Sequence, residues 1–407
     1  MDISIQKSKL LNHQKIQITG SKSESNRLLL LQALYPEISI ENLSNSDDSV
    51  LMQKALSSDD TIVDIHHAGT AMRFLTAYFS IQNDREVILT GSSRMKERPI
   101  KILVDALRAL GAEITYLEHD GFPPIKIVGK NLTKSKVSLQ ANVSSQYISA
   151  LLLIASRLVN GLELHLEGKI TSVPYIKMTL SLLNEVGIKT SFAENKISVK
   201  PQISNLNPKV LTVESDWSSA SYFYSVIALS EIGTEITILS YKKQSLQGDS
   251  VLAELYQSFG VETYFSVNSV RLVKSNALAK KDLNFHLNDA PDIAQTIAVT
   301  AFGLGVACDM TGLHTLKIKE TDRLVALKTE LEKLGAEVTI SDATLHLKSA
   351  NKIESGVSIA TYKDHRMAMA FAPLGLKTSI LIENAEVVSK SYPQFWEDFK
   401  TIGFNIK

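Results

Sequence analysis

Apolar residues along this chain form a repeated pattern, in which a helix-like run ends at a glycine and a strand-like run follows. The pattern recurs at five glycines that lie 68 to 76 residues apart, namely Gly111, Gly187, Gly260, Gly335 and Gly403. Glycine just past a helix end suits a left-handed C-cap, and the alternating residues after it predict a strand. Helix–glycine–strand sequences occur in any α/β protein, so the near-constant spacing is the informative feature. With a weaker copy at residues 33–41, the pattern predicts six α/β units.

The chain is too long for one ordinary hydrophobic core, because 407 residues normally divide into two or three domains. A polar segment with asparagine and proline, residues 205–208, precedes the strand-like residues 210–213 near the chain midpoint. Such a segment is typical of a crossover between domains. We therefore expect three units on each side of it.

Charge and cysteine content exclude several classes of protein. Lys plus Arg equals Asp plus Glu, 43 against 43, which argues against a general nucleic-acid or membrane-surface binder. Cys308 is the one cysteine, so no disulfide forms within the chain and a reducing compartment is expected. The first ten residues contain no apolar signal segment, and the apolar runs 148–155 and 293–308 are too short or too interrupted to span a bilayer. These features predict a cytoplasmic protein.

Candidate chemistry begins at residues 20–27, G-S-K-S-E-S-N-R, between strand-like residues 15–18 and the apolar run 28–34. A strand, a turn and a helix start direct backbone N–H groups at an anion, and Lys22 and Arg27 add two cations. The P-loop spacing is absent. Ordinary helix capping would explain this stretch if it stood alone.

Similar polar stretches recur wherever a loop meets a helix-like run. They are residues 64–73, 91–99, 142–147, 171–175, 214–222, 288–296, 317–323, 364–367 and 389–393. Together they predict helix N-termini that converge on strongly anionic ligands, with Asp292, Glu320 and Asp364 among the cations as candidate proton carriers. The adjacent His66 and His67 have no third ligand near in sequence, so no metal site is expected.

Nine of these stretches, including G-S-K-S-x-S-N-R, A-G-T-A-M-R, R-M-K-E-R-P, K-E-T-D-R and D-H-R-M, occur in the order and spacing typical of one family. From Lys22 to Lys390 the chain resembles the 5-enolpyruvylshikimate-3-phosphate (EPSP) synthases, the 3-phosphoshikimate 1-carboxyvinyltransferases of the shikimate pathway. The sister family, the UDP-N-acetylglucosamine enolpyruvyl transferases, typically carries a functional cysteine in a mobile loop. Here Cys308 lies in an apolar run and is expected in the core, which disfavours the sister family.

The resemblance implies an α/β fold of two similar domains, each of three repeated units with helices inside and sheets outside. The domains are expected at residues 21–213 and at residues 1–20 plus 214–407, with the active site in the cleft between them. The implied reaction transfers the enolpyruvyl group of phosphoenolpyruvate to the 5-hydroxyl of shikimate 3-phosphate and releases phosphate, in the pathway that leads to chorismate and the aromatic amino acids. The resemblance implies no metal or organic cofactor, no nucleic-acid or membrane partner, and a monomer.

The resemblance also assigns residues to each substrate. Shikimate 3-phosphate is expected to contact Lys22, Ser23, Arg27, Ser144, Ser145, Gln146, Ser172, Tyr175, Asp292 and Lys319. Phosphoenolpyruvate is expected to contact Lys22, Gly69, Arg94, Gln146, Arg323, Arg366 and Lys390. Asp292 is the expected base for the attacking hydroxyl, Glu320 the acid that protonates the methylene carbon, with Lys22 as a relay. His365 is expected to support the site beside Arg366.

Three positions depart from the family pattern. His67 stands where asparagine is usual, Thr315 where asparagine is common, and Phe74 where proline is frequent. His67 and Thr315 leave open an enolpyruvyl transferase with another alcohol as acceptor, and Phe74 bears on sensitivity to the inhibitor glyphosate. A non-catalytic anion-binding protein is the remaining alternative, but simple anion binding has no need of the acids Asp292 and Glu320.

Overall fold

The computed structural model describes residues 1–140, 144–168, 170, 173–202, 205–276 and 282–407. The chain divides into two compact units. We call Gly20–Val213 the inserted unit, and Met1–Thr19 together with Glu214–Lys407 the split unit. The predicted contact residue Ser172 lies outside the described residues.

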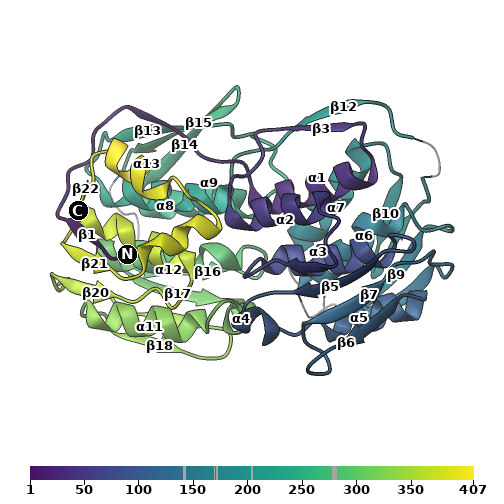
Figure 1. Ribbon diagram of the computed structural model, residues 1–407. Coiled ribbons are helices and arrows are strands. Elements are labelled where there is room, and N and C mark those ends of the chain that lie inside the picture. The colour runs from purple at the N-terminus through teal and green to yellow at the C-terminus, as the bar shows by residue number, and fades with distance from the viewer. Residues whose placement is uncertain (141–143, 169, 171–172, 203–204, 277–281) are drawn as a thin grey trace. The chain divides into compact units, whose positions relative to one another are not determined.

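The inserted unit alternates helices and short strands (Figure 1). Its elements are α1 (Lys22–Leu34), β3 (Ile38–Glu41), α2 (Asp47–Ser57), β4 (Ile62–Asp64), α3 (Gly69–Ser80), β5 (Glu86–Thr90), α4 (Ser93–Lys96), α5 (Lys101–Leu110), β6 (Glu113–Tyr116), β7 (Ile125–Val128), β8 (Lys136–Gln140), α6 (Ser145–Ala155), β9 (Leu162–Glu167), α7 (Val173–Glu185), β10 (Thr190–Ala193), β11 (Lys196–Val199) and β12 (Lys209–Thr212).

The split unit has the same alternation, with several short 3₁₀ helices (η). Its elements are β1 (Ile3–Gln6), β2 (Gln14–Gln17), α8 (Trp217–Leu229), β13 (Glu235–Leu239), η1 (Gly248–Val251), α9 (Leu252–Leu255), η2 (Tyr256–Phe259), β14 (Val261–Ser266), β15 (Ser269–Lys274), β16 (Asp282–His286), η3 (Pro291–Ile293), α10 (Ala294–Leu304), β17 (Ala307–Thr311), η4 (His314–Ile318), α11 (Arg323–Lys333), β18 (Val338–Ile340), β19 (Leu345–Leu347), β20 (Val357–Ile359), α12 (His365–Phe371), η5 (Ala372–Leu376), β21 (Ile380–Ile382), η6 (Ala385–Lys390), α13 (Phe395–Thr401) and β22 (Asn405–Ile406).

The sheets repeat one topology. In the part of the chain that is described, five sheets have four strands, and in each a parallel pair is extended by two antiparallel strands, as in β4-β5-β7-β6 and β16-β17-β19-β18. The sixth sheet is the parallel pair β12-β3. Each unit contains three of these sheets, so the sheets match the six α/β units predicted from the glycine spacing. All five of those glycines have a positive φ, between 77° and 111°, as the predicted left-handed caps require.

Each unit is built around three helices that lie inside its sheets. In the inserted unit α1, α3 and α6 contact one another, and in the split unit α10 contacts both α8 and α12 (Figure 1). Every residue of α3 is buried, so this helix is enclosed on all sides. Cys308 is also buried, in β17, as the sequence predicted.

Several helices begin earlier than their apolar runs. The run at residues 28–34 predicted a helix that starts after the polar stretch, but α1 starts at Lys22 and contains that stretch in its first turns. Glu24, Ser25, Asn26 and Arg27 are all buried there. This polar stretch therefore forms the first turns of a central helix, with most of its side chains buried.

Candidate active site

In the inserted unit, most candidate residues lie at the N-terminal ends of α1, α3 and α6, whereas Arg94 lies in α4 and Tyr175 in α7. Lys22 opens α1, and its Nζ lies 3.7 Å from Oδ2 of Asp48 in α2. Arg27, one turn further, is 2% exposed. We call Lys22, Arg27, Gly69, Arg73 and Gln146 the arginine–hydroxyl cluster, because its guanidinium groups contact neutral oxygen atoms.

Arg27 connects three helices through hydrogen bonds to neutral groups. Its Nε donates to Oγ1 of Thr179 at 2.8 Å, and its Nη2 donates to Oγ of Ser149 at 3.0 Å. Nη1 donates to the carbonyl of Ser23 at 2.7 Å, and Nη2 also donates to the carbonyl of Tyr175 at 3.3 Å. Burial lowers the pKa of Arg27 to about 10, against weaker favourable contributions from Tyr175 and Glu24. Arg27 thereby fixes the backbone at two predicted shikimate 3-phosphate contacts, Ser23 and Tyr175.

Two further arginines, Arg73 and Arg98, lie beside the first residue of α3, Gly69. Gly69 leaves room for Arg98, because a Cβ at position 69 would lie 2.5 Å from Nη1 of Arg98. Arg73 donates from Nη1 to the carbonyl of Gly69 at 3.2 Å and from Nη2 to the carbonyl of Pro99 at 3.0 Å. Burial, and then the nearby charge of Arg98, lower the pKa of Arg73 to about 10. Arg94, by contrast, is half exposed and forms a 2.7 Å ion pair with Glu97.

The start of α6 contributes amide and hydroxyl groups. Ser144 is the N-cap, and its Oγ accepts from the backbone N–H of Gln146. The Gln146 side chain donates from Nε2 to Oγ1 of Thr70 at 3.2 Å, while Ser145 is buried at the first helical position. The hydroxyl of Tyr147 donates to the same Pro99 carbonyl that Arg73 contacts, at 2.6 Å. The first turns of α3 and α6 and the loop before α5 are therefore held together.

In the split unit, the candidate residues form a network of ion pairs around Arg323. This side chain is 2% exposed and contacts three carboxylates: Asp364 at 2.6 Å, Glu320 at 2.8 Å and Asp292 at 2.9 Å. We call Asp292, Glu320, Arg323, Asp364 and Arg366 the carboxylate cluster. Burial alone would lower the pKa of Arg323, but the three carboxylates together raise it above its ordinary value.

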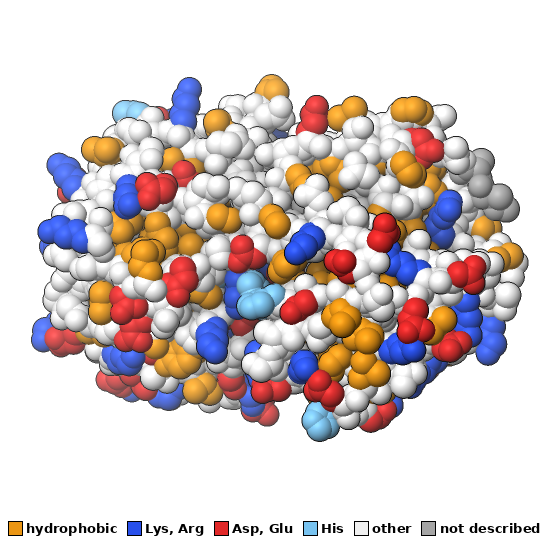
Figure 2. All heavy atoms as spheres, in the orientation of Figure 1, with side chains coloured by type: hydrophobic (Ala, Val, Ile, Leu, Met, Phe, Trp, Pro, Cys, Tyr) orange, Lys and Arg blue, Asp and Glu red, His pale blue; other side chains and the backbone are white. Residues whose placement is uncertain are grey.

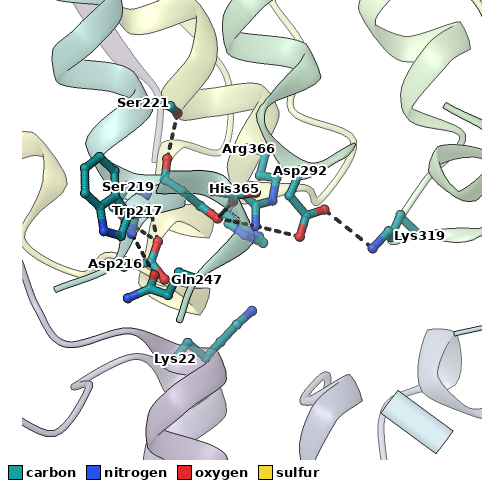
Figure 3. Close-up of polar contacts among 12 residues, drawn as sticks. Lys22, Asp216, Trp217, Ser219, Ser221, Gln247, Asp292, Lys319, His365 and Arg366 are labelled. Carbon is teal, nitrogen blue, oxygen red and sulfur yellow. Dashed lines mark hydrogen bonds and ion pairs between the residues drawn. The ribbon is translucent and has the colours of Figure 1, made fainter. Parts of the chain in front are cut away.

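Arg366 and Lys319 also contact the carboxylate of Asp292. Nη2 of Arg366 lies 3.0 Å from Oδ2 of Asp292, and Nζ of Lys319 lies 3.4 Å from Oδ1 of the same carboxylate (Figure 3). Asp364 caps α12 by accepting from the backbone N–H of Arg366 at 2.9 Å. His365 is buried, and Lys390 donates to the carbonyl of Lys363 at 2.7 Å.

The departures from the family pattern have defined surroundings. The Nδ1 atoms of His66 and His67 lie 2.7 Å apart, and Nε2 of His67 lies 3.7 Å from Asp47. Phe74 is fully buried, with the Arg27 guanidinium 5.4 Å from its ring centroid. The hydroxyl of Thr315, in η4, is buried without a hydrogen-bond partner among the described residues.

Two buried polar residues near these sites, Gln247 and Asp249, were not predicted from the sequence. Gln247 accepts from the backbone N–H of Trp217 at 2.9 Å and donates to the carbonyl of Ser215 at 2.9 Å, which fixes the start of α8. Asp249, in η1, accepts from the hydroxyl of Ser218. Both lie within the sequence S-L-Q-G-D, residues 245–249, which is not bordered by a long apolar run and so gave no helix signal.

Some features are absent from the described residues. No group of three or more His, Cys, Asp or Glu side chains among them is arranged to hold a metal ion. No helix in the described part of the chain combines the length and the apolar character needed to cross a bilayer. On the face drawn in Figure 2, acidic and basic side chains are interspersed, without a continuous surface of one sign.

Comparison with known proteins agrees with this architecture. The profile of a family described as EPSP synthase (3-phosphoshikimate 1-carboxyvinyltransferase) matches residues 54–399. Proteins named 3-phosphoshikimate 1-carboxyvinyltransferase from Bacteroides fragilis and Histophilus somni are 47% and 35% identical, over 96% of this chain and of each relative.

Solved structures share the fold at lower identity. An EPSP synthase from Acinetobacter baumannii superimposes with a TM-score of 0.81 at 21% identity, covering 100% of this chain and 99% of that one. The enolpyruvyl transferase NikO from Streptomyces tendae gives 0.76 at 14% identity, covering 100% and 98%. The predicted two-domain α/β fold of enolpyruvyl transferases is therefore confirmed.

Proposed function

Because this chain belongs to the EPSP synthase family, we propose that it transfers the enolpyruvyl group of phosphoenolpyruvate to the 5-hydroxyl of shikimate 3-phosphate, with release of phosphate, in the shikimate pathway. The observation that carries the proposal is the carboxylate cluster, in which Asp292 and Glu320 share the buried Arg323. Two acids held beside cations suit a reaction that both adds and removes protons at an anionic substrate.

The proposed reaction has two stages. In the first, Glu320 gives a proton to the methylene carbon of phosphoenolpyruvate, the 5-hydroxyl attacks C2, and Asp292 accepts the hydroxyl proton. In the second, Glu320 takes a proton back from the new methyl group while the C2–O bond to phosphate breaks, which restores the double bond. The leaving phosphate receives the proton that Asp292 had accepted. Arginine and lysine side chains would stabilise the phosphate and carboxylate charges throughout.

The carboxylate cluster also implies a competition. Asp292 holds Arg323, Arg366 and Lys319 through its two oxygen atoms. An incoming anion would compete with Asp292 for Arg366 and Lys319. Arg323 would stay paired with two other carboxylates, Glu320 and Asp364. Substrate binding would therefore release Asp292 from part of its ion pairing at the moment when it is needed as a base.

We further propose that the arginine–hydroxyl cluster and the carboxylate cluster complete one site in a cleft, in a monomer that works in the cytoplasm. The proposed ligands support a shared site, because the resemblance assigns each substrate contacts from both units. A donor–acceptor dye pair, one in each unit, should report closure when both substrates are added. Size-exclusion chromatography with light scattering measures the oligomeric state.

The test of function is phosphate release from phosphoenolpyruvate. The wild-type chain should release phosphate only when shikimate 3-phosphate is also present. Glu320→Gln should lower kcat by about 10²- to 10⁴-fold, the usual effect of removing a general acid, while calorimetry still detects ligand binding. Turnover at the wild-type rate would show that Glu320 is not the acid.

The acceptor is tested in the same assay. His67 and Thr315, which replace residues usual in the family, motivate a panel of other alcohols. Turnover of one of them, with none of shikimate 3-phosphate, would replace the proposed acceptor. Ligand binding without phosphate release from any pair would instead indicate an anion-binding protein.

A further inference from the structure

Asp249 is a buried carboxylate outside the predicted site that is linked to Arg366 through one serine hydroxyl. Asp249 is 3% exposed and belongs to η1, far in sequence from α12. Its Oδ2 accepts the proton of the Ser218 hydroxyl, at the start of α8. The oxygen of that hydroxyl in turn lies 3.3 Å from Nη2 of Arg366, which donates to it.

The direction of these two hydrogen bonds follows from the chemistry of a serine hydroxyl, which has one proton and two lone pairs. When the proton is given to Asp249, only lone pairs remain to face Arg366. The ionised carboxylate thus makes Ser218 an acceptor for the guanidinium. The same Nη2 donates to Asp292 at 3.0 Å, so the position of Arg366 is defined from two sides.

We propose that Asp249 is a positioning residue for the transferase reaction: through the Ser218 hydroxyl it orients Arg366 for phosphoenolpyruvate. The inference rests on the proposed function, in which Arg366 contacts that substrate. Asp249 itself touches neither substrate in this scheme.

The surroundings of Asp249 make its ionisation sensitive to pH. Burial and the nearby charge of Asp292 raise the pKa of Asp249 to about 7, while Arg366 and the Ser218 hydrogen bond act in the opposite direction and Asp216 adds a small increase. Below pH 7 the neutral acid no longer requires the serine proton. Ser218 can then turn its proton toward Arg366, where it would oppose the guanidinium N–H. We therefore expect the orientation of Arg366 to weaken as the pH falls.

Ionisation of Asp249 affects the stability of the fold in the opposite direction to its effect on the orientation of Arg366. A carboxyl group whose pKa is raised in the folded state, here to about 7 from 3.8, destabilises the fold progressively as the pH rises between those values. Removing the charge should then leave the protein at least as stable at pH 8. A positioning role thus predicts that stability and substrate affinity respond in opposite directions, whereas a purely structural role predicts that both decrease.

The experiment compares Asp249→Asn, Ser218→Ala and the double variant in the phosphate-release assay between pH 6.5 and 9. At pH 8, each single variant should raise KM for phosphoenolpyruvate about tenfold, as expected for one hydrogen bond to a charged group, with little change in kcat or in KM for shikimate 3-phosphate. The double variant should be no worse than either single variant, because both changes interrupt one relay. The wild-type KM for phosphoenolpyruvate should rise below pH 7, and that of Asp249→Asn should not.

Asp398→Asn is the matched control. Asp398 is a partly buried acid of the same unit that accepts from the Tyr392 hydroxyl at 2.6 Å, and burial raises its pKa too. This variant should keep the wild-type KM and its pH profile. Thermal unfolding at pH 8 should show a melting temperature of Asp249→Asn equal to or above that of the wild type.

Several results would overturn the inference. A lower KM for phosphoenolpyruvate in Asp249→Asn would mean that the Asp249 charge only repels the anionic substrate. Additive effects in the double variant would mean that Asp249 and Ser218 act independently. A lower melting temperature of Asp249→Asn, with KM either raised or unchanged, would indicate a structural role. Failure of the wild-type chain to release phosphate would instead count against the proposed function, so the two failures are distinguishable.

Discussion

The two clusters hold their buried arginines in opposite ways. In the arginine–hydroxyl cluster, Arg27 donates to carbonyl and hydroxyl oxygens, and its pKa is lowered to about 10. In the carboxylate cluster, Arg323 contacts three carboxylates, and its pKa is raised. The charge of Arg27 is not neutralised by its hydrogen-bond partners, whereas the charge of Arg323 is neutralised by the carboxylates around it.

This difference indicates that the two clusters have different chemical roles. A buried cation among neutral dipoles attracts an anion, because bringing one in relieves the cost of burying the charge. A cation surrounded by acids cannot attract an anion in the same way, but it fixes the acids at short distances from one another. The inserted unit is thus suited to bind phosphate, and the split unit is suited to proton transfer.

The largest expected effect comes from removing the compensated arginine. Arg323→Met leaves Asp292, Glu320 and Asp364 without their shared cation, and breaking a buried ion pair costs about 3–5 kcal/mol of the free energy of unfolding. Urea denaturation followed by tryptophan fluorescence measures this loss, since Trp217 lies in the same unit. Turnover should fall below detection.

The control for this variant is Arg271→Met. Arg271 pairs with Glu235 on the surface of the same unit, where its side chain is 44% exposed, so about 0–1 kcal/mol is expected. The double variant Arg323→Met/Asp364→Asn should recover part of the stability by removing one uncompensated charge. A loss in Arg323→Met no larger than that in Arg271→Met would contradict the view that the three carboxylates depend on Arg323.

A smaller effect on stability is expected for Arg27→Met. Its hydrogen-bond partners, such as Thr179 and Ser149, are neutral, so no carboxylate is left buried without its cation. We expect a loss of about 1–3 kcal/mol in the free energy of unfolding, typical of unsatisfied buried polar groups. The affinity for shikimate 3-phosphate, measured by calorimetry, should fall at least tenfold, because the uncompensated charge disappears.

Arg157→Met serves as the control for this variant. Arg157 stacks over Tyr35 in the same unit, 5.3 Å from the ring centroid, and lies outside the predicted site. Its removal should leave the affinity for shikimate 3-phosphate unchanged. If Arg27→Met destabilised the fold as much as Arg323→Met, the contrast between the two clusters would not hold.

The sequence predicted the repeated units better than it predicted the contacts within the clusters. A glycine such as Gly111 marks a helix end by a local rule, so five helix–strand junctions could be found without tertiary information. The side-chain partners of Arg27, Thr179 and Ser149, lie on α7 and α6, more than a hundred residues away, and no local pattern encodes them. The start of α1 was misplaced because buried polar residues interrupt the apolar pattern there. Asp249 was missed because its burial depends on packing against α8, not on its own segment.

The smallest expected effect tests whether Phe74 contributes to the properties of Arg27. The Phe74 ring lies 5.4 Å from the Arg27 guanidinium, and both side chains are buried. Phe74→Leu keeps an apolar group but removes the aromatic face, a change worth about 1 kcal/mol of unfolding free energy with some additional cavity cost. The affinity for shikimate 3-phosphate should change by no more than about fivefold, which is 1 kcal/mol expressed as a ratio. In the Arg27→Met background, Phe74→Leu should cost less unfolding free energy, because the cation–π interaction is already absent. A double-mutant cycle on the free energy of unfolding therefore measures that interaction directly. A coupling energy of zero would mean that Phe74 only fills space beside α1, and that the charge of Arg27 is set by burial and by its hydrogen bonds alone.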